Sequence, residues 1–84
     1  SLEVVREMAI KGLQKTGSNY VISISGIAGP SGGSPGKPVG TVCIAWGNAD
    51  IIESKIFFFS GDRQKVRSQT IETSLKEMLK YLKL

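Results

Sequence analysis

The first side chains that could take part in a reaction belong to two serines. They lie near the end of a short segment in which apolar residues alternate with other residues. Ser23 and Ser25 lie in the segment NYVISIS. A serine acts as a nucleophile only when a neighbouring base accepts its proton. The sequence contains no histidine, so that base would be a lysine or a carboxylate, and the spacing places neither beside these serines. The residues alone therefore exclude a Ser-His triad formed within this sequence.

A glycine-rich segment directly follows these serines. Residues 26–40 hold six of the ten glycines and all three prolines of the sequence. Glycine backbone N–H groups can surround an anion. The named phosphate motifs do not fit, however, because Gly36-Lys37 is followed by Pro38 where a P-loop needs Ser or Thr. A segment of this kind is either a ligand-binding loop or a flexible surface connection, and the residues leave both alternatives open.

A third candidate lies where an apolar run meets a helical pattern, at Ser60-Gly61-Asp62-Arg63. A helix N-terminus attracts anions through its free N–H groups and its dipole. Arg63 would add a bidentate grip on a phosphate or carboxylate. In the alternative interpretation Asp62 caps the helix and Arg63 is solvated. The spacing alone favours this alternative.

Composition excludes several classes of protein. The chain has 84 residues, 11 Lys and Arg against 7 Asp and Glu, one cysteine and no histidine. Zinc-finger, haem and iron–sulfur sites lack their ligands, and no disulfide framework is available. The single thiol, Cys43, indicates a reduced, cytoplasmic protein and, lying mid-strand, a small buried side chain. The formal charge of +4 allows an anionic partner, but the basic residues are interleaved with glutamates, which disfavours a nucleic-acid-binding module.

The hydrophobic spacing predicts an α/β fold with an antiparallel hairpin. Ser1 and Gly17 are expected to cap the first helix at its two ends. Apolar residues on both sides of the first strand indicate that both faces of the sheet need a covering layer. The expected elements are a helix over 1–16, strands over 19–25, 41–46 and 51–59, and a helix from 60 to the C-terminus. The apolar side of this last helix is expected at Val66, Ile71, Leu75, Met78, Leu79 and Leu82.

Two motifs in this order resemble one family. The stretch from Ile22 to Val42, ISISGIAGPSGGSPGKPVGTV, resembles the signature of the nicotinamide-nucleotide amidase family, the CinA C-terminal domain. The later FFFSGDRQKVR matches that family's F-x-G-D-R-x-x-V-R segment, and EVVREMAIKGL looks like the helix that precedes the signature. The resemblance covers nearly the whole sequence.

The resemblance implies a three-layer α/β/α sandwich that hydrolyses the carboxamide of nicotinamide mononucleotide to nicotinic acid mononucleotide and ammonia, without a metal or cofactor. In the family the nucleophile is a Ser in an E-S-C-T-G-G motif, assisted by a Tyr and a Lys from a Y-x-N-x-x-K segment. Neither motif occurs in this sequence. The chain therefore resembles the C-terminal half of the domain, and the N-terminal half is its implied partner, with a homo-oligomer as a further option. A non-catalytic nucleotide-binding or regulatory relative is the alternative function.

The same resemblance assigns roles to residues of this chain. Ser25 would be a supporting hydroxyl beside the nucleophile. Arg63 would face the anionic part of the mononucleotide, with Arg67 a weaker candidate one turn later. The residues that would form the wall of the substrate pocket through close backbone approach are Gly26, Ile27, Ala28, Gly29, Gly32 and Gly33.

Overall fold

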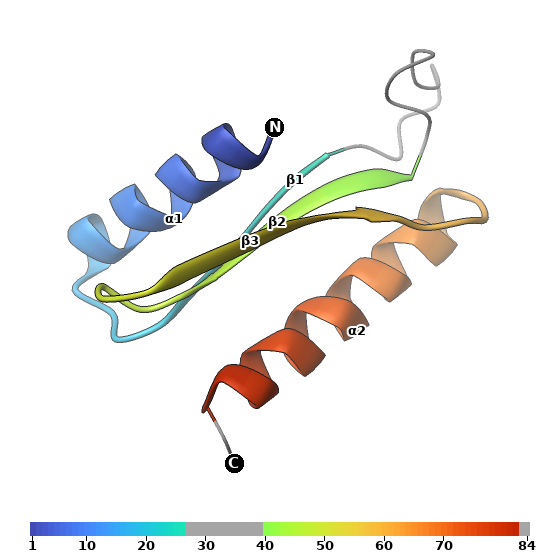
Figure 1. Ribbon diagram of the computed structural model, residues 1–84. Coiled ribbons are helices and arrows are strands. Elements are labelled where there is room, and N and C mark those ends of the chain that lie inside the picture. Colours follow the sequence, from blue (N-terminus) through green and yellow to red (C-terminus); the bar gives the residue numbers. More distant parts are fainter. Residues whose placement is uncertain (27–39, 83–84) are drawn as a thin grey trace.

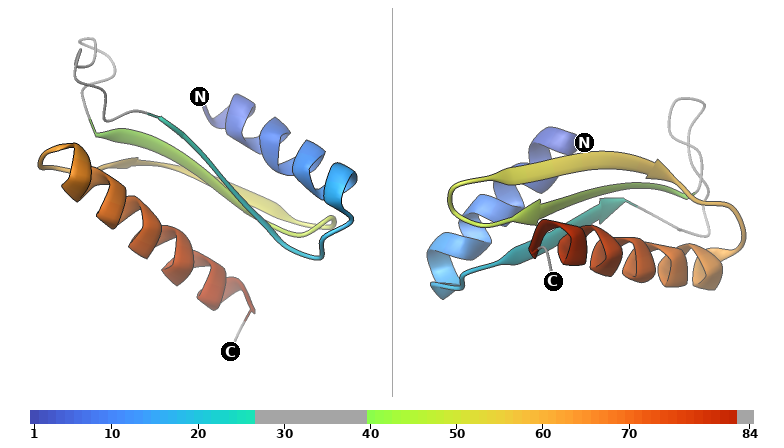
Figure 2. Two further views of the ribbon diagram at one scale, coloured as in Figure 1. Left: turned by 180° about the vertical axis from the view of Figure 1, so that it is seen from behind. Right: turned by 60° about the horizontal axis from the view of Figure 1, so that its bottom comes forward.

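The computed structural model is a three-stranded antiparallel sheet with one helix on each face (Figure 1). It describes residues 1–26 and 40–82. The elements are α1 (Leu2–Thr16), β1 (Val21–Gly26), β2 (Thr41–Gly47), β3 (Ile52–Phe58) and α2 (Arg63–Leu82). The views in Figure 2 agree that α1 and α2 lie on opposite faces of the sheet. The predicted α/β class, order of elements and hairpin are confirmed, and each sheet face has a single helix as its covering layer.

Helix α1 begins and ends where its capping residues predict. The Ser1 Oγ accepts a hydrogen bond from the Val4 N–H at 3.2 Å. At the other end Gly17 adopts a left-handed conformation with φ of 68°, and its N–H donates to the Leu13 carbonyl at 3.0 Å. Between these caps one side of the helix is buried, at Val5, Ala9 and Leu13.

Strand β2 lies at the centre of the sheet and is buried on both faces. Its side chains alternate between two clusters. Val42, Ile44 and Trp46 pack toward α2. Cys43 and Ala45 pack with Val5 and Ala9 of α1. The thiol is therefore a small buried group, as expected.

The turn between β2 and β3 is held by one asparagine side chain. The Asn48 Oδ1 accepts hydrogen bonds from the backbone N–H groups of Asp50 and Ile51, both at 2.9 Å. The Asn48 N–H in turn donates to the Ile51 carbonyl at 2.9 Å. An Asx turn of this kind reverses the chain locally, which explains why the turn was visible in the sequence.

The buried side of α2 agrees with the predicted apolar side in part, since Val66 and Met78 are buried and Leu82 packs against the core as expected. Val66, Thr70, Ser74 and Met78 face the sheet, whereas Ile71, Leu75 and Leu79 are each more than half exposed. The two hydroxyls are acceptable in the core because each donates to the carbonyl four residues earlier, at 2.7 Å. Small residues at these positions let the helix axis approach the large Ile44 and Trp46 side chains of β2.

Strand β1 places its serines on the face that α1 covers, as its alternation predicts. The Ser23 hydroxyl donates to the Val5 carbonyl at 2.6 Å and is buried. Ser23 is therefore a structural link between strand and helix. In the described part of the chain, neither helix combines the length and apolar character needed to span a bilayer.

Adjacent substitutions in α2 test which side of the helix is buried. Ser74→Lys should lower the free energy of unfolding by about 2 kcal/mol or more, because it places an ammonium group in the core. Leu75→Lys should change it by less than about 0.5 kcal/mol. Urea unfolding of the 84-residue chain measures both. A larger loss for Leu75→Lys would support the apolar side predicted from sequence instead.

Candidate functional site

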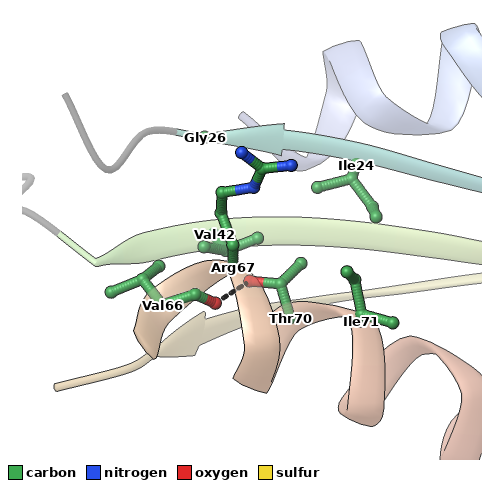
Figure 3. A pocket seen from close by; sticks show the side chains of 7 residues that line it. All are labelled: Ile24, Gly26, Val42, Val66, Arg67, Thr70 and Ile71. Carbon is green, nitrogen blue, oxygen red and sulfur yellow. Dashed lines mark hydrogen bonds between the residues drawn. The ribbon is translucent and has the colours of Figure 1, made fainter. Parts of the chain in front are cut away.

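A hollow of about 260 Å³ lies between the end of β1 and the first turns of α2. Figure 3 shows that the side chains of the strands and of the helix point into the same space. Its lining is apolar except for one guanidinium and one hydroxyl. The lining residues are Ile24, Gly26, Val42, Val66, Arg67, Thr70 and Ile71.

Arg67 supplies the charge of this hollow. Its side chain extends from α2 toward Gly26 at the end of β1 (Figure 3). Within residues 1–26 and 40–82, the two ion pairs that form are Glu72–Lys76 and Glu77–Lys80, and neither involves Arg67. A guanidinium without a carboxylate partner beside an apolar wall attracts an anionic group such as a phosphate or carboxylate.

Thr70 is the second polar group of the hollow and was not identified from the sequence. Its hydroxyl hydrogen is used, since Oγ1 donates to the Val66 carbonyl at 2.7 Å. The Oγ1 lone pairs remain able to accept a hydrogen bond. The sequence could have indicated Thr70 through its spacing, because residues three apart, such as Arg67 and Thr70, lie close together on the surface of a helix.

Gly26 ends β1 where no larger residue fits. Its φ is +141°, and a Cβ added there would lie 2.5 Å from the Thr41 carbonyl oxygen and 2.8 Å from the Val42 Cα. Both of these atoms belong to the backbone, so no side chain can move aside. Glycine therefore allows β1 and β2 to close together at the edge of the hollow.

The two predicted arginines differ in position. Both side chains are exposed, but Arg63, at the start of α2, does not line the hollow, whereas Arg67, the weaker candidate from sequence, does. Residues four apart share one side of a helix, so Arg63 lies on the same side of α2 as Arg67, one turn earlier. Asp62 caps the helix, because its Oδ1 accepts from the Lys65 N–H at 2.9 Å. The capping alternative is thus correct for Asp62.

Ser25 lies on the other face of the sheet from the hollow. It is half-buried and pairs in register with Cys43, which packs toward α1. Ser25 and Gly26 are neighbours in the chain, so among the described residues the hydroxyl comes near the hollow at the end of β1. The other predicted pocket residues, Ile27, Ala28, Gly29, Gly32 and Gly33, lie outside the described residues.

The lining residues are suited to binding rather than to bond breaking. They include a cation, a hydroxyl and apolar side chains, but no lysine, cysteine or carboxylate to serve as a nucleophile or base. The lining residues of this hollow therefore offer one cationic group for an anionic ligand and supply no thiol, amine or carboxylate for a chemical step.

Comparison with known proteins agrees with the order of motifs and with the fold. The family model described as the CinA C-terminal domain matches residues 1–82. The chain belongs to the CinA C-terminal domain family. It is 44% identical to a nicotinamide-nucleotide amidohydrolase PncC of Pseudomonas putida, over 94% of this chain and 49% of that protein. It is 48% identical to a CinA-like protein of Thermotoga maritima, over 99% of this chain and 20% of that protein.

Solved CinA-family structures share the fold. A competence or damage-inducible protein from Enterobacter asburiae superposes with a TM-score of 0.87 at 40% identity, over 94% of this chain and 50% of that one. A competence/damage-inducible protein from Agrobacterium tumefaciens gives a TM-score of 0.88 at 29% identity, over 96% and 50% of the two chains. This CinA-family chain thus spans about half the length of the shorter relatives that it matches.

Gly26→Ala tests the close approach at the edge of the hollow. We expect it to lower the free energy of unfolding by about 3 kcal/mol, because the added Cβ meets backbone atoms. Gly17→Ala is the matched control, since Gly17 also has a positive φ but has open space around it. It should cost only about 1 kcal/mol. Equal losses in urea unfolding would show that the contact with β2 is unimportant.

Proposed function

We propose that this chain forms the substrate-holding half of a nicotinamide-nucleotide amidase domain. The observation that carries the proposal is the Arg67 guanidinium beside the apolar hollow at Gly26, which forms no ion pair with the described residues 1–26 and 40–82. A mononucleotide carries an anionic phosphate, which suits Arg67, and one flat aromatic ring whose face can pack against the aliphatic side chains of the lining. The named activity of the Pseudomonas putida relative supports the same substrate class.

Arg67 would hold the phosphate group of the substrate through charge-assisted hydrogen bonds. Arg63, one turn earlier on the same side of α2, would add charge where the phosphate is most exposed to solvent. Ile24, Val42 and Ile71 would pack against the face of the aromatic ring and exclude water from it. Holding the substrate at several points fixes the amide carbon relative to the group that attacks it.

The reaction itself would be an acyl transfer, with its nucleophile on the other half of the domain. By the family resemblance, a serine hydroxyl attacks the amide carbon while a lysine accepts its proton. The lysine then passes this proton to the departing nitrogen, so that the C–N bond breaks and ammonia leaves. Water then hydrolyses the resulting ester and gives back the serine. Ser25, at the end of β1, would donate a supporting hydrogen bond beside this nucleophile.

Ammonia release from nicotinamide mononucleotide tests the proposal directly. The 84-residue chain alone should show no release above blank, because it lacks the nucleophile and base. A joined polypeptide, in which the unmatched half of the Pseudomonas putida relative precedes this chain, should release ammonia. A joined polypeptide that folds and binds the mononucleotide without releasing ammonia would favour the non-catalytic, nucleotide-binding alternative.

Substitution of the two arginines in the joined polypeptide tests their roles. Arg67→Ala removes a charged hydrogen bond worth about 1.5–3 kcal/mol, so KM should rise about 10- to 100-fold with a smaller change in kcat. Arg63→Ala should raise KM less. Lys76→Ala is the control, because it removes one positive charge from an exposed position of the same helix. An unchanged KM in Arg67→Ala would remove this residue from the substrate site.

A further inference from the structure

Gln69 connects the second turn of α2 to the segment that directly follows β3. Its Nε2 amide donates one hydrogen bond to the Ser60 carbonyl at 2.8 Å and another to the Lys65 carbonyl at 3.0 Å. Two carbonyl oxygens at these distances need a group with two N–H donors, and a primary amide supplies both. The bond to Lys65 stays within α2, so it fixes the direction in which the side chain reaches Ser60. Gln69 therefore fastens the helix to the end of the sheet.

The segment that Gln69 reaches is itself held against the start of β2. Phe59, the residue before Ser60, donates its N–H to the Gly40 carbonyl at 2.9 Å. A Cβ added at Gly40 would overlap the Phe59 carbonyl oxygen and would lie 3.7 Å from the Val66 Cγ2. Gly40 directly precedes β2, which supplies Val42 to the hollow. The strand wall and the helix wall of the hollow are therefore joined through Gly40, Phe59, Ser60 and Gln69.

The polar side chains in the buried contact between α2 and β2 do little to fix the height of the helix along the sheet. Thr70 and Ser74 are small, and both hydroxyls donate to carbonyls of α2 itself. A helix rises about 1.5 Å per residue, so a slide of less than one residue moves every side chain of α2 by about 1 Å. A misplacement of this size can cost an enzyme up to about a hundredfold in rate.

We propose that Gln69 is a positioning residue for substrate binding, which holds α2 at the height where Arg67 is level with Gly26. Gln69 is not among the residues that line the hollow, so it acts through Arg67 rather than on the ligand. The two side chains lie on different sides of α2, with Gln69 toward Ser60 and Arg67 toward Gly26 (Figure 3). The inference rests on the proposed function for the contact between Arg67 and the phosphate.

The contact between Val66 and Gly40 reports the position of α2 without reference to catalysis. One Gly40 Hα lies in the direction of the added Cβ, so it should give a strong nuclear Overhauser effect with the Val66 methyl group in the 84-residue chain. Gln69→Met keeps a side chain of similar length and removes both N–H donors. We expect this variant to lose most of the Overhauser effect, because α2 is no longer fastened beside Gly40.

Glu53→Met is the matched control for the loss of a hydrogen bond between distant residues. The Glu53 Oε2 accepts from the Trp46 Nε1 at 3.0 Å, at the opposite end of β2 from Gly40. This variant should keep the Overhauser effect between Val66 and Gly40. An undiminished effect in Gln69→Met would overturn the proposal, and so would an equal loss in both variants, since that would indicate general loosening of the fold.

A double-mutant cycle in the joined polypeptide tests whether Gln69 acts through Arg67. Gln69→Met should raise KM for nicotinamide mononucleotide about fivefold, with a smaller change in kcat. In the Arg67→Ala background the same change should alter KM by less than about 1.5-fold, because the group that Gln69 positions is already absent. Glu53→Met should leave KM unchanged in both backgrounds. Equal fold-increases for Gln69→Met in both backgrounds would overturn the positioning role.

The two experiments separate the failure of this inference from the failure of the proposed function. An unchanged KM in Arg67→Ala would reject the proposed function, and the Overhauser effect would still decide whether Gln69 fixes the position of α2. A raised KM in Arg67→Ala together with an unchanged KM in Gln69→Met would reject the positioning role alone.

Discussion

The burial of β2 on both faces is the constraint on which the rest of the structure depends. Five consecutive residues of this strand, from Val42 to Trp46, are buried, and they supply side chains to two separate clusters. Each helix packs on one face of this strand, and each neighbouring strand hydrogen-bonds to one of its edges. Since all four other elements attach to β2, the two edges of the molecule receive less covering than its centre.

The packing of α2 on β2 also determines which side chains of α2 line the hollow at Gly26. Thr70 and Ser74 are small enough to face the large side chains of β2, and their hydroxyls are satisfied within the helix. This orientation turns the row that begins at Arg67 toward the end of β1. A rotation that buried Leu75 would carry the guanidinium away from Gly26. The position of Arg67 in the hollow and the exposure of Ile71, Leu75 and Leu79 are therefore two consequences of one helix orientation.

Sequence patterns predicted correctly the features that depend on neighbours in the chain. The caps at Ser1 and Gly17, the Asn48 turn and the alternation of β1 involve contacts within a few residues. The buried side of α2 was predicted correctly at Val66 and Met78 but wrongly at Ile71, Leu75 and Leu79, because hydrophobic spacing favours larger apolar residues over the two buried hydroxyl residues. The error arose because small residues let α2 pack closely against β2. The hydrophobic spacing within α2 alone contains no information about this contact.

The family, the α/β class and the absence of the family's nucleophile motif could all be read from the printed residues, since each depends on residue type and order. The sequence could not show that Arg67 rather than Arg63 lines the hollow. The two arginines lie on the same side of α2, and only the packed structure shows which of them is level with the end of β1. The placement of Ser25 opposite the hollow likewise needed the register with Cys43. Local chemistry selects the elements, whereas the distances between segments far apart in sequence exist only once the sheet has formed and both helices have packed against it.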